Sequence, residues 1–209
     1  MTFTEIIAET DPDDPANASA PGTDGAGTDG GGAAGTAGGA GADTAGGAGA
    51  DTAGTVGAVG AVVDRAEVAG LLERYLLSLD DDGIELDEGW AAALFTTDAV
   101  VAFPMSRHEG RAGLAAYHRD ALAAFATTQH LGSPGAVKVD GDQARLRANL
   151  MSTHVHHAHH ARPQGNLPPL FTTGTFVEGT ARRTAHGWRL SLLSFRVLWA
   201  DGAPPPPTA

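Results

Sequence analysis

The chain has 209 residues, no cysteine and a formal net charge of −12. The absence of cysteine excludes disulfide frameworks, thiolate metal sites and cysteine nucleophiles. The charge is uneven: residues 1–60 carry nine acidic side chains and no Lys or Arg, which leaves 16 of the 25 acids and all 13 bases for the rest. A nearly neutral remainder gives no electrostatic reason to expect nucleic acid or an anionic membrane as a partner.

Composition divides the chain into three parts. Residues 1–61 form an acidic tail rich in Gly and Ala, which offers little apolar area to bury, so we expect this tail to be disordered. Residues 203–209 are expected to be a disordered Pro-rich end, and residues 62–202 are long enough for one folded domain. The start lacks the basic flank and apolar stretch of a signal peptide, and no apolar run approaches the roughly 20 residues of a membrane span. We therefore expect a cytoplasmic protein.

Helices are predicted in the first half of this domain. Asp64 and Glu67 have the spacing of a capping box, which predicts that the first helix begins there. The helix would bury one apolar stripe and end near Asp80. The stripe consists of Val68, Leu71, Leu72, Tyr75, Leu76 and Leu79. Two further helices are predicted over residues 88–95 and 111–126, with a strand over residues 99–103 between them.

The chain after Thr127 has the pattern of an antiparallel β-meander. Residues 129–139 are followed by a hairpin turn at residues 140–142, and residues 144–150 then alternate between apolar and polar side chains. Two further strands are expected over residues 171–183 and 188–199. Helices followed by a meander are typical of an α+β fold.

The alternation of the 144–150 strand predicts where the chemistry lies. Ser152 and His154 have the same parity as the apolar side chains, so His154 should point inward. Asp80 ends the helix that packs on this sheet, and His130 begins the neighbouring strand. A carboxylate with two imidazoles is suited to general acid/base catalysis near neutral pH. The alternative is that His154 is a core histidine with satisfied hydrogen bonds.

Short motifs in a fixed order resemble a known family. They are residues 74–80 (Arg-Tyr-Leu-Leu-Ser-Leu-Asp), 94–100, 110–111, 128–130 (Thr-Gln-His) and 187–189 (Gly-Trp-Arg). Together they resemble the SnoaL-like branch of the nuclear transport factor 2-like superfamily, whose relatives include polyketide cyclases and scytalone dehydratase. The resemblance implies a cone: a curved antiparallel β-sheet packed against about three N-terminal helices. It also implies a homodimer that forms through the outer faces of two sheets.

The resemblance to scytalone dehydratase assigns roles to individual residues. It implies that His130 and His154 are the two catalytic histidines and that Asp80 orients His154, without a metal or other cofactor. The two tyrosines that polarise the substrate carbonyl in that family correspond to Leu79 and Phe103 here, which makes the same dehydration less suited to this pocket. We expect a substrate pocket with four aromatic side chains, although Tyr117 also fits a half-buried core position. These are Tyr75, Trp90, Phe103 and Tyr117.

A histidine-rich segment, residues 154–160, suggests a metal site as an alternative. On a strand, however, His154, His156 and His160 would share one face, and the segment has no recognised ligand spacing such as His-Glu-x-x-His. We therefore assign no metal ligand here. A metal-dependent oxygenase remains a third functional hypothesis that depends on this segment alone.

Two functions of different classes follow from these observations. The first is a cofactor-independent lyase or isomerase, of cyclase or dehydratase type, that acts on a small cyclic or polyketide-like substrate. The second is a non-catalytic module that binds a small molecule or supports assembly with the same pocket, because apolar pockets bind ligands whether or not a reaction follows. The fold alone does not decide between them.

Overall fold

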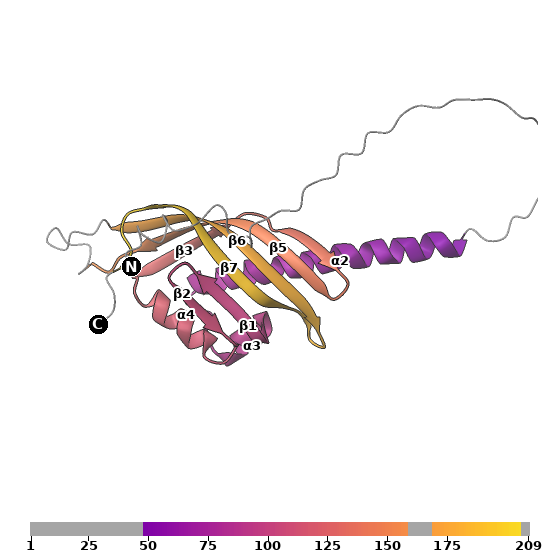
Figure 1. The fold of residues 1–209 in the computed structure, drawn as a ribbon, viewed down its shortest axis with the longest axis horizontal. Coiled ribbons are helices and arrows are strands. Elements are labelled where there is room, and N and C mark those ends of the chain that lie inside the picture. The colour runs from indigo at the N-terminus through magenta and orange to yellow at the C-terminus, as the bar shows by residue number, and fades with distance from the viewer. Residues whose placement is uncertain (1–47, 159–168, 206–209) are drawn as a thin grey trace, which may run out of the picture.

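The computed structural model describes residues 48–158 and 169–205, with side chains from Gly57 onward, and within these ranges it contains three helices and seven strands (Figure 1). The helices are α2 (Ala48–Asp80), α3 (Glu88–Leu94) and α4 (Leu114–Leu122). The strands are β1 (Phe95–Phe103), β2 (Ser106–Glu109), β3 (Thr127–Gly132), β4 (Ala136–Asp140), β5 (Gln143–Val155), β6 (Leu170–Thr184) and β7 (Gly187–Asp201). This arrangement confirms the α+β class.

The strands form one open sheet with the order β2-β1-β7-β6-β5-β3, and β4 also pairs with β5. Neighbouring strands are antiparallel except β1 and β7, which are parallel. The sheet is therefore mixed where the sequence predicted an antiparallel one. A parallel pair requires a long connection between its strands, and residues 104–186 provide it.

Helix α2 packs along the sheet and extends past it at its N-terminal end (Figure 1). It begins at Ala48, inside the segment that composition assigned to the tail, so the predicted start near residue 62 is wrong. Alanine has the highest helix propensity and no proline interrupts residues 48–80, so nothing local stops the helix at Asp64. Asp64 instead accepts hydrogen bonds from Arg183 Nη2 (2.6 Å) and Trp188 Nε1 (3.2 Å) and joins α2 to the β6–β7 hairpin.

Strand β5 is central to the sheet, because it pairs with β3, β4 and β6. The predicted alternation is confirmed: its apolar side chains are buried against α2 while the polar ones between them are exposed. The buried set consists of Ala144, Leu146, Ala148 and Leu150. The same parity continues to Ser152, so the inner face of β5 runs from the core into the cavity described below.

Three predicted element boundaries differ from the structure. Phe95 begins β1 and does not end α3, and α4 is shorter than the expected 111–126. Strand β2 was not predicted, because its sequence, Ser-Arg-His-Glu, has no apolar alternation. At the C-terminal end, Pro204 and Pro205 lie against the cavity, whereas residues 206–209 and 1–47 lie outside the described ranges.

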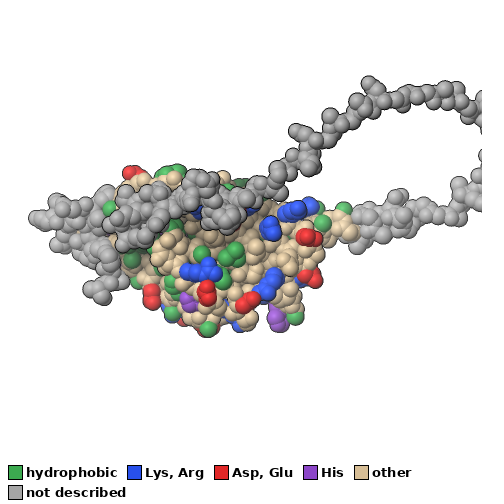
Figure 2. All heavy atoms as spheres, viewed as in Figure 1, with side chains coloured by type: hydrophobic (Ala, Val, Ile, Leu, Met, Phe, Trp, Pro, Cys, Tyr) green, Lys and Arg blue, Asp and Glu red, His purple; other side chains and the backbone are tan. Residues whose placement is uncertain are grey.

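The surface shows no single dominant charge where Figure 2 draws described side chains. Lys and Arg are interspersed with Asp and Glu on that face. The described residues also form ion pairs, as between Arg147 and Glu178 and between Arg183 and Asp142. None of the helices described here combines the length and the apolar character that a membrane span requires.

Candidate active site

A cavity of about 460 Å³ lies between the inner face of the sheet and helices α2 and α4. Its wall is mainly apolar and aromatic, with polar groups both from the sheet and from α4. The aromatic part consists of Tyr75, Phe103, Tyr117, Phe125, Phe171 and Phe195. The rings of Phe103 and Phe195 stack with centroids 4.6 Å apart. A cavity of this size and character is typical of a site for a small organic molecule.

Asp80 and His130 form the best-connected polar pair at this cavity. Asp80 is the last residue of α2, and its Oδ1 accepts a hydrogen bond from His130 Nδ1 at 2.7 Å. The same carboxylate accepts from the His130 backbone N–H and from the Thr128 hydroxyl, at 2.5 and 2.9 Å. Because a carboxylate only accepts, Nδ1 of His130 carries a proton, and in the neutral form of the ring Nε2 keeps its lone pair. His130 lines the cavity, so this lone pair is available to a ligand there.

His154 lies next to His130, and the two ring centroids are 5.5 Å apart. As predicted, His154 points into the cavity. Its Nδ1 donates to the carbonyl of Phe171 at 3.3 Å, and its ring packs against Phe125 at 4.5 Å. Burial, with a smaller contribution from the positive charge of protonated His130, lowers the pKa of His154 to about 4. His154 is therefore neutral near pH 7.

The predicted pairing of Asp80 with His154 is wrong, because the hydrogen-bond partner of Asp80 is His130. The register of the sheet explains the difference. His154 lies opposite Thr128, whereas His130 lies opposite Ser152, and the end of α2 meets β3 at Thr128 and His130. The three predicted residues are thus in one place, but the carboxylate orients the other histidine.

Three of the four predicted aromatic residues line the cavity: Tyr75, Phe103 and Tyr117. Trp90 does not. Its indole N–H donates to Ser78 Oγ at 2.8 Å, and its ring packs on Tyr75 with centroids 6.4 Å apart in the hydrophobic core. Trp90 is therefore a core residue. The Tyr117 hydroxyl lies 2.6 Å from Ser106 Oγ in the unpredicted strand β2.

His118 is a cavity residue that the sequence did not indicate. It is buried in α4, with Nδ1 donating to the Leu114 carbonyl at 2.8 Å and Nε2 accepting from the Tyr75 hydroxyl at 2.9 Å. Burial lowers the pKa of His118 to about 4 and raises that of Tyr75 far above its usual range. The pair is therefore neutral and joins α4 to α2. Ser152 also lines the cavity. The alternation along β5 predicted that it points inward, although it was not assigned to the site.

The histidine-rich segment lies only partly within the described ranges, which exclude His159 and His160. Within those ranges, no three His, Asp or Glu side chains are placed to hold one metal ion. His156 is buried and its Nε2 donates to the carbonyl of Ala203 at 2.9 Å, next to the cavity residues Pro204 and Pro205. His157 Nε2 contacts the carbonyl of Ala123.

Comparisons with known proteins agree with this architecture. The SnoaL-like domain family matches residues 61–194. Among solved structures, the Kfla4162 protein from Kribbella flavida is 27% identical, with a TM-score of 0.61, covering 68% of this chain and 95% of that one. A suggested scytalone dehydratase from Novosphingobium aromaticivorans is 19% identical (TM-score 0.54; 71% and 96% covered). A type 2 hexachlorocyclohexane dehydrochlorinase is 16% identical (TM-score 0.53; 74% and 95% covered).

The last two structures establish similarity of fold alone at these identities. No curated protein matches the sequence. A structure from Salmonella enterica, described as a nuclear transport factor 2-like superfamily protein, superposes with a TM-score of 0.53 at 19% identity, over 65% of this chain and 92% of that one. The family match covers more than half of the chain and ends within the last strand. The chain therefore belongs to the SnoaL-like domain family and has the nuclear transport factor 2-like fold.

Proposed function

We propose that the protein is an acid/base lyase or isomerase for a small cyclic substrate, with His130 as the general base and Asp80 as the residue that orients it. The observation that carries the proposal is the contact between Asp80 Oδ1 and His130 Nδ1 at 2.7 Å beside an apolar cavity. This contact leaves Nε2 of His130 as an acceptor that faces the cavity. It also places a negative charge where the imidazolium would form.

The proposed step is a proton transfer that needs no cofactor. A C–H bond of the bound substrate breaks, its proton moves to His130 Nε2, and its electron pair forms a new double bond. At the same time an adjacent bond gives up its pair: an existing π bond shifts in an isomerisation, or the bond to a leaving hydroxyl group breaks in an elimination. Asp80 stabilises the resulting imidazolium. His130 then returns the proton to another carbon, which isomerises the substrate, or to a departing hydroxyl group, which eliminates water. His154 stays neutral, and its Nε2 can accept a hydrogen bond from a substrate hydroxyl.

The comparisons support the reaction class but not a substrate. The dehydrochlorinase with this fold is named for removing the elements of hydrogen chloride from a cyclic molecule, which is an elimination. The two positions where scytalone dehydratase has phenols are Leu79 and Phe103 here, and both line the cavity. This apolar substitution favours the alternative, a module that binds a small molecule without converting it.

A cyclic ketone with acidic C–H bonds separates the two functions without knowledge of the natural substrate. We suggest 2-tetralone in D₂O, with exchange of its protons beside the carbonyl followed by NMR. The parent protein should accelerate exchange, and Asp80→Asn, His130→Gln and His154→Ala should each slow it. The loss for His130→Gln should be about 10²- to 10⁴-fold, the usual contribution of a general base.

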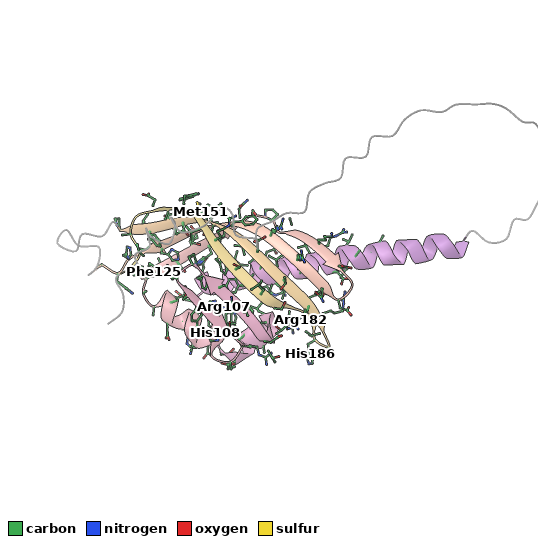
Figure 3. The ribbon with its side chains drawn as sticks, viewed as in Figure 1. Arg107, His108, Phe125, Met151, Arg182 and His186 are labelled. Atoms are coloured by element: carbon green, nitrogen blue, oxygen red, sulfur yellow. The ribbon has the colours of Figure 1, made fainter. Side chains whose placement is uncertain are left out.

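His186→Gln is the matched control, because His186 is exposed in the β6–β7 turn, far from Phe125 and the cavity (Figure 3). This control should exchange 2-tetralone at the parental rate. Parental rates in all three site variants would contradict the proposed roles. A parent that binds 2-tetralone and does not accelerate its exchange would support the non-catalytic alternative.

A further inference from the structure

The floor of the cavity contains a row of hydroxyl groups that the proposed proton transfer does not use. Ser152 in β5 and Thr173 in β6 line the cavity and are only 5% and 7% exposed. Thr173 Oγ1 lies 3.4 Å from Thr175 Oγ1 on the same strand. The Ser152 hydroxyl, in contrast, makes no hydrogen bond to another residue among residues 57–158 and 169–205. A hydroxyl that lines a cavity without a protein partner is suited to binding a ligand or a water molecule.

The register of the sheet places this row next to the proposed base. His130 is paired with Ser152, and Ser152 is paired with Thr173, so the three side chains are adjacent on three neighbouring strands. Neighbouring strands are about 4.8 Å apart. An oxygen bound at Ser152 would therefore lie about one or two covalent bonds from a carbon in contact with His130 Nε2.

The charges around the cavity restrict the kind of oxygen that can bind. Among the described lining residues there is no Lys or Arg, and the one carboxylate of the wall, Asp120, is exposed. The Asp80 carboxylate lies directly behind His130. A carboxylate or phosphate ligand would bring a second anion close to Asp80 without a fixed positive partner, which is costly in an apolar cavity. An uncharged oxygen avoids this cost.

We propose that Ser152, with Thr173 beside it, binds the carbonyl oxygen of an uncharged cyclic ketone while His130 removes a proton from the adjacent carbon. This inference rests on the proposed function, because it assigns the substrate class of the same site. As the C–H bond breaks, its electron pair forms a carbon–carbon double bond and the carbonyl π pair moves to the oxygen. The Ser152 hydroxyl donates a hydrogen bond to that oxygen, and return of the proton to carbon regenerates a ketone.

Binding of three naphthalene derivatives tests this assignment. 2-Naphthol is a stable analogue of the enol of 2-tetralone, naphthalene lacks the oxygen, and 2-naphthoate carries a charge. Calorimetric titration of the parent should give tighter binding of 2-naphthol than of 2-naphthoate. Ser152→Ala should weaken binding of 2-naphthol by about three- to tenfold, the value of one hydrogen bond, and leave binding of naphthalene unchanged. Thr173→Val should give a smaller loss in the same direction.

Ser191→Ala is the matched control, because this strand serine bonds Thr180 Oγ1 and does not line the cavity. Its affinities should equal those of the parent. Unchanged affinity of Ser152→Ala for 2-naphthol, or tighter binding of 2-naphthoate than of 2-naphthol, would overturn the assignment. This result is distinguishable from that of the exchange experiment. Parental exchange by His130→Gln would contradict the role of His130 as the base, whereas the binding series would still test Ser152 as the oxygen-binding residue.

Discussion

At the residue scale, the cavity combines three histidines in different environments. His130 bonds a carboxylate, His154 bonds a backbone carbonyl, and His118 bonds a carbonyl and a phenol. Both His118 and His154 have a pKa of about 4 because burial disfavours their charged forms. A histidine whose pKa is lowered by folding binds fewer protons in the folded than in the unfolded state between about pH 6.5 and pH 4.

This difference predicts a pH dependence of stability. Because the unfolded state binds more protons in that interval, the contribution of these histidines to the free energy of unfolding should be fully present above pH 6.5. It should decrease as the pH approaches 4. His118→Gln removes one of the two groups, so its loss of stability between pH 7 and pH 4.5 should be smaller than the parental loss, by up to about 3 kcal/mol. Urea unfolding at both pH values measures this. An equal loss in both proteins would show that His118 titrates normally.

The sequence indicated the members of the site better than their connections. The parity of β5 was sufficient to turn Ser152 and His154 inward, because alternation along a strand is a local property. The partner of Asp80 was not predictable in this way, because it depends on which β3 residues meet the end of α2. The same limit applies to His118 and Tyr75, which are 43 residues apart. Contacts between distant segments are set by tertiary packing.

At the element scale, hydrophobic periodicity predicted the long helices and strands. It did not predict segments without a periodic apolar face. The apolar stripe of α2 and the alternation of β5 were recognised because each contributes a regular face to the core. The polar strand β2 has no such face, and its neighbour β1 supplies all of its pairing. The start of α2 was not predicted, because its Gly/Ala-rich sequence has no apolar stripe that would indicate a helix packed on the core.

The stripe of α2 makes a quantitative prediction. Leu71 is 0% exposed in the core, whereas Leu77 on the same helix is 66% exposed. Leu71→Ala should lower the free energy of unfolding by about 2–5 kcal/mol, because it removes buried apolar area and leaves a cavity. Leu77→Ala has the same helix propensity change and should alter stability by less than about 0.5 kcal/mol. Comparable losses in chemical denaturation would mean that α2 does not pack on the sheet through this stripe.

At the scale of the whole molecule, apolar side chains remain exposed on the outer face of the sheet. Leu131 in β3 lies opposite Met151 in β5, and Gly174 of β6 separates Met151 from Trp199 in β7. Trp199 lies over Gly174, whose missing side chain makes room for the indole. Trp199 is 48% exposed, because an irregularity in the β6–β7 register between Gly174 and Thr175 turns it outward. Met151 lies on the upper side of the sheet in Figure 3.

These outer side chains provide a test of the predicted homodimer. If the outer faces of two sheets pair, Met151→Lys places a charge in the interface and should shift the protein toward the monomer. Sedimentation equilibrium of the parent and the variant measures the mass. The control is Arg107→Gln on the edge strand β2 (Figure 3), which should keep the parental mass. A parental dimer that is unchanged by Met151→Lys would place the interface elsewhere, and a monomeric parent would contradict the predicted dimer.

The central claim is that His130, oriented by Asp80, acts as a base inside an apolar cavity. The most direct measurement is the rate of hydrogen–deuterium exchange of 2-tetralone in the presence of the parent protein and of His130→Gln. The account predicts that the parent accelerates exchange and that the variant loses about 10²-fold or more of this rate while it remains folded. Equal rates for the two proteins would contradict the account.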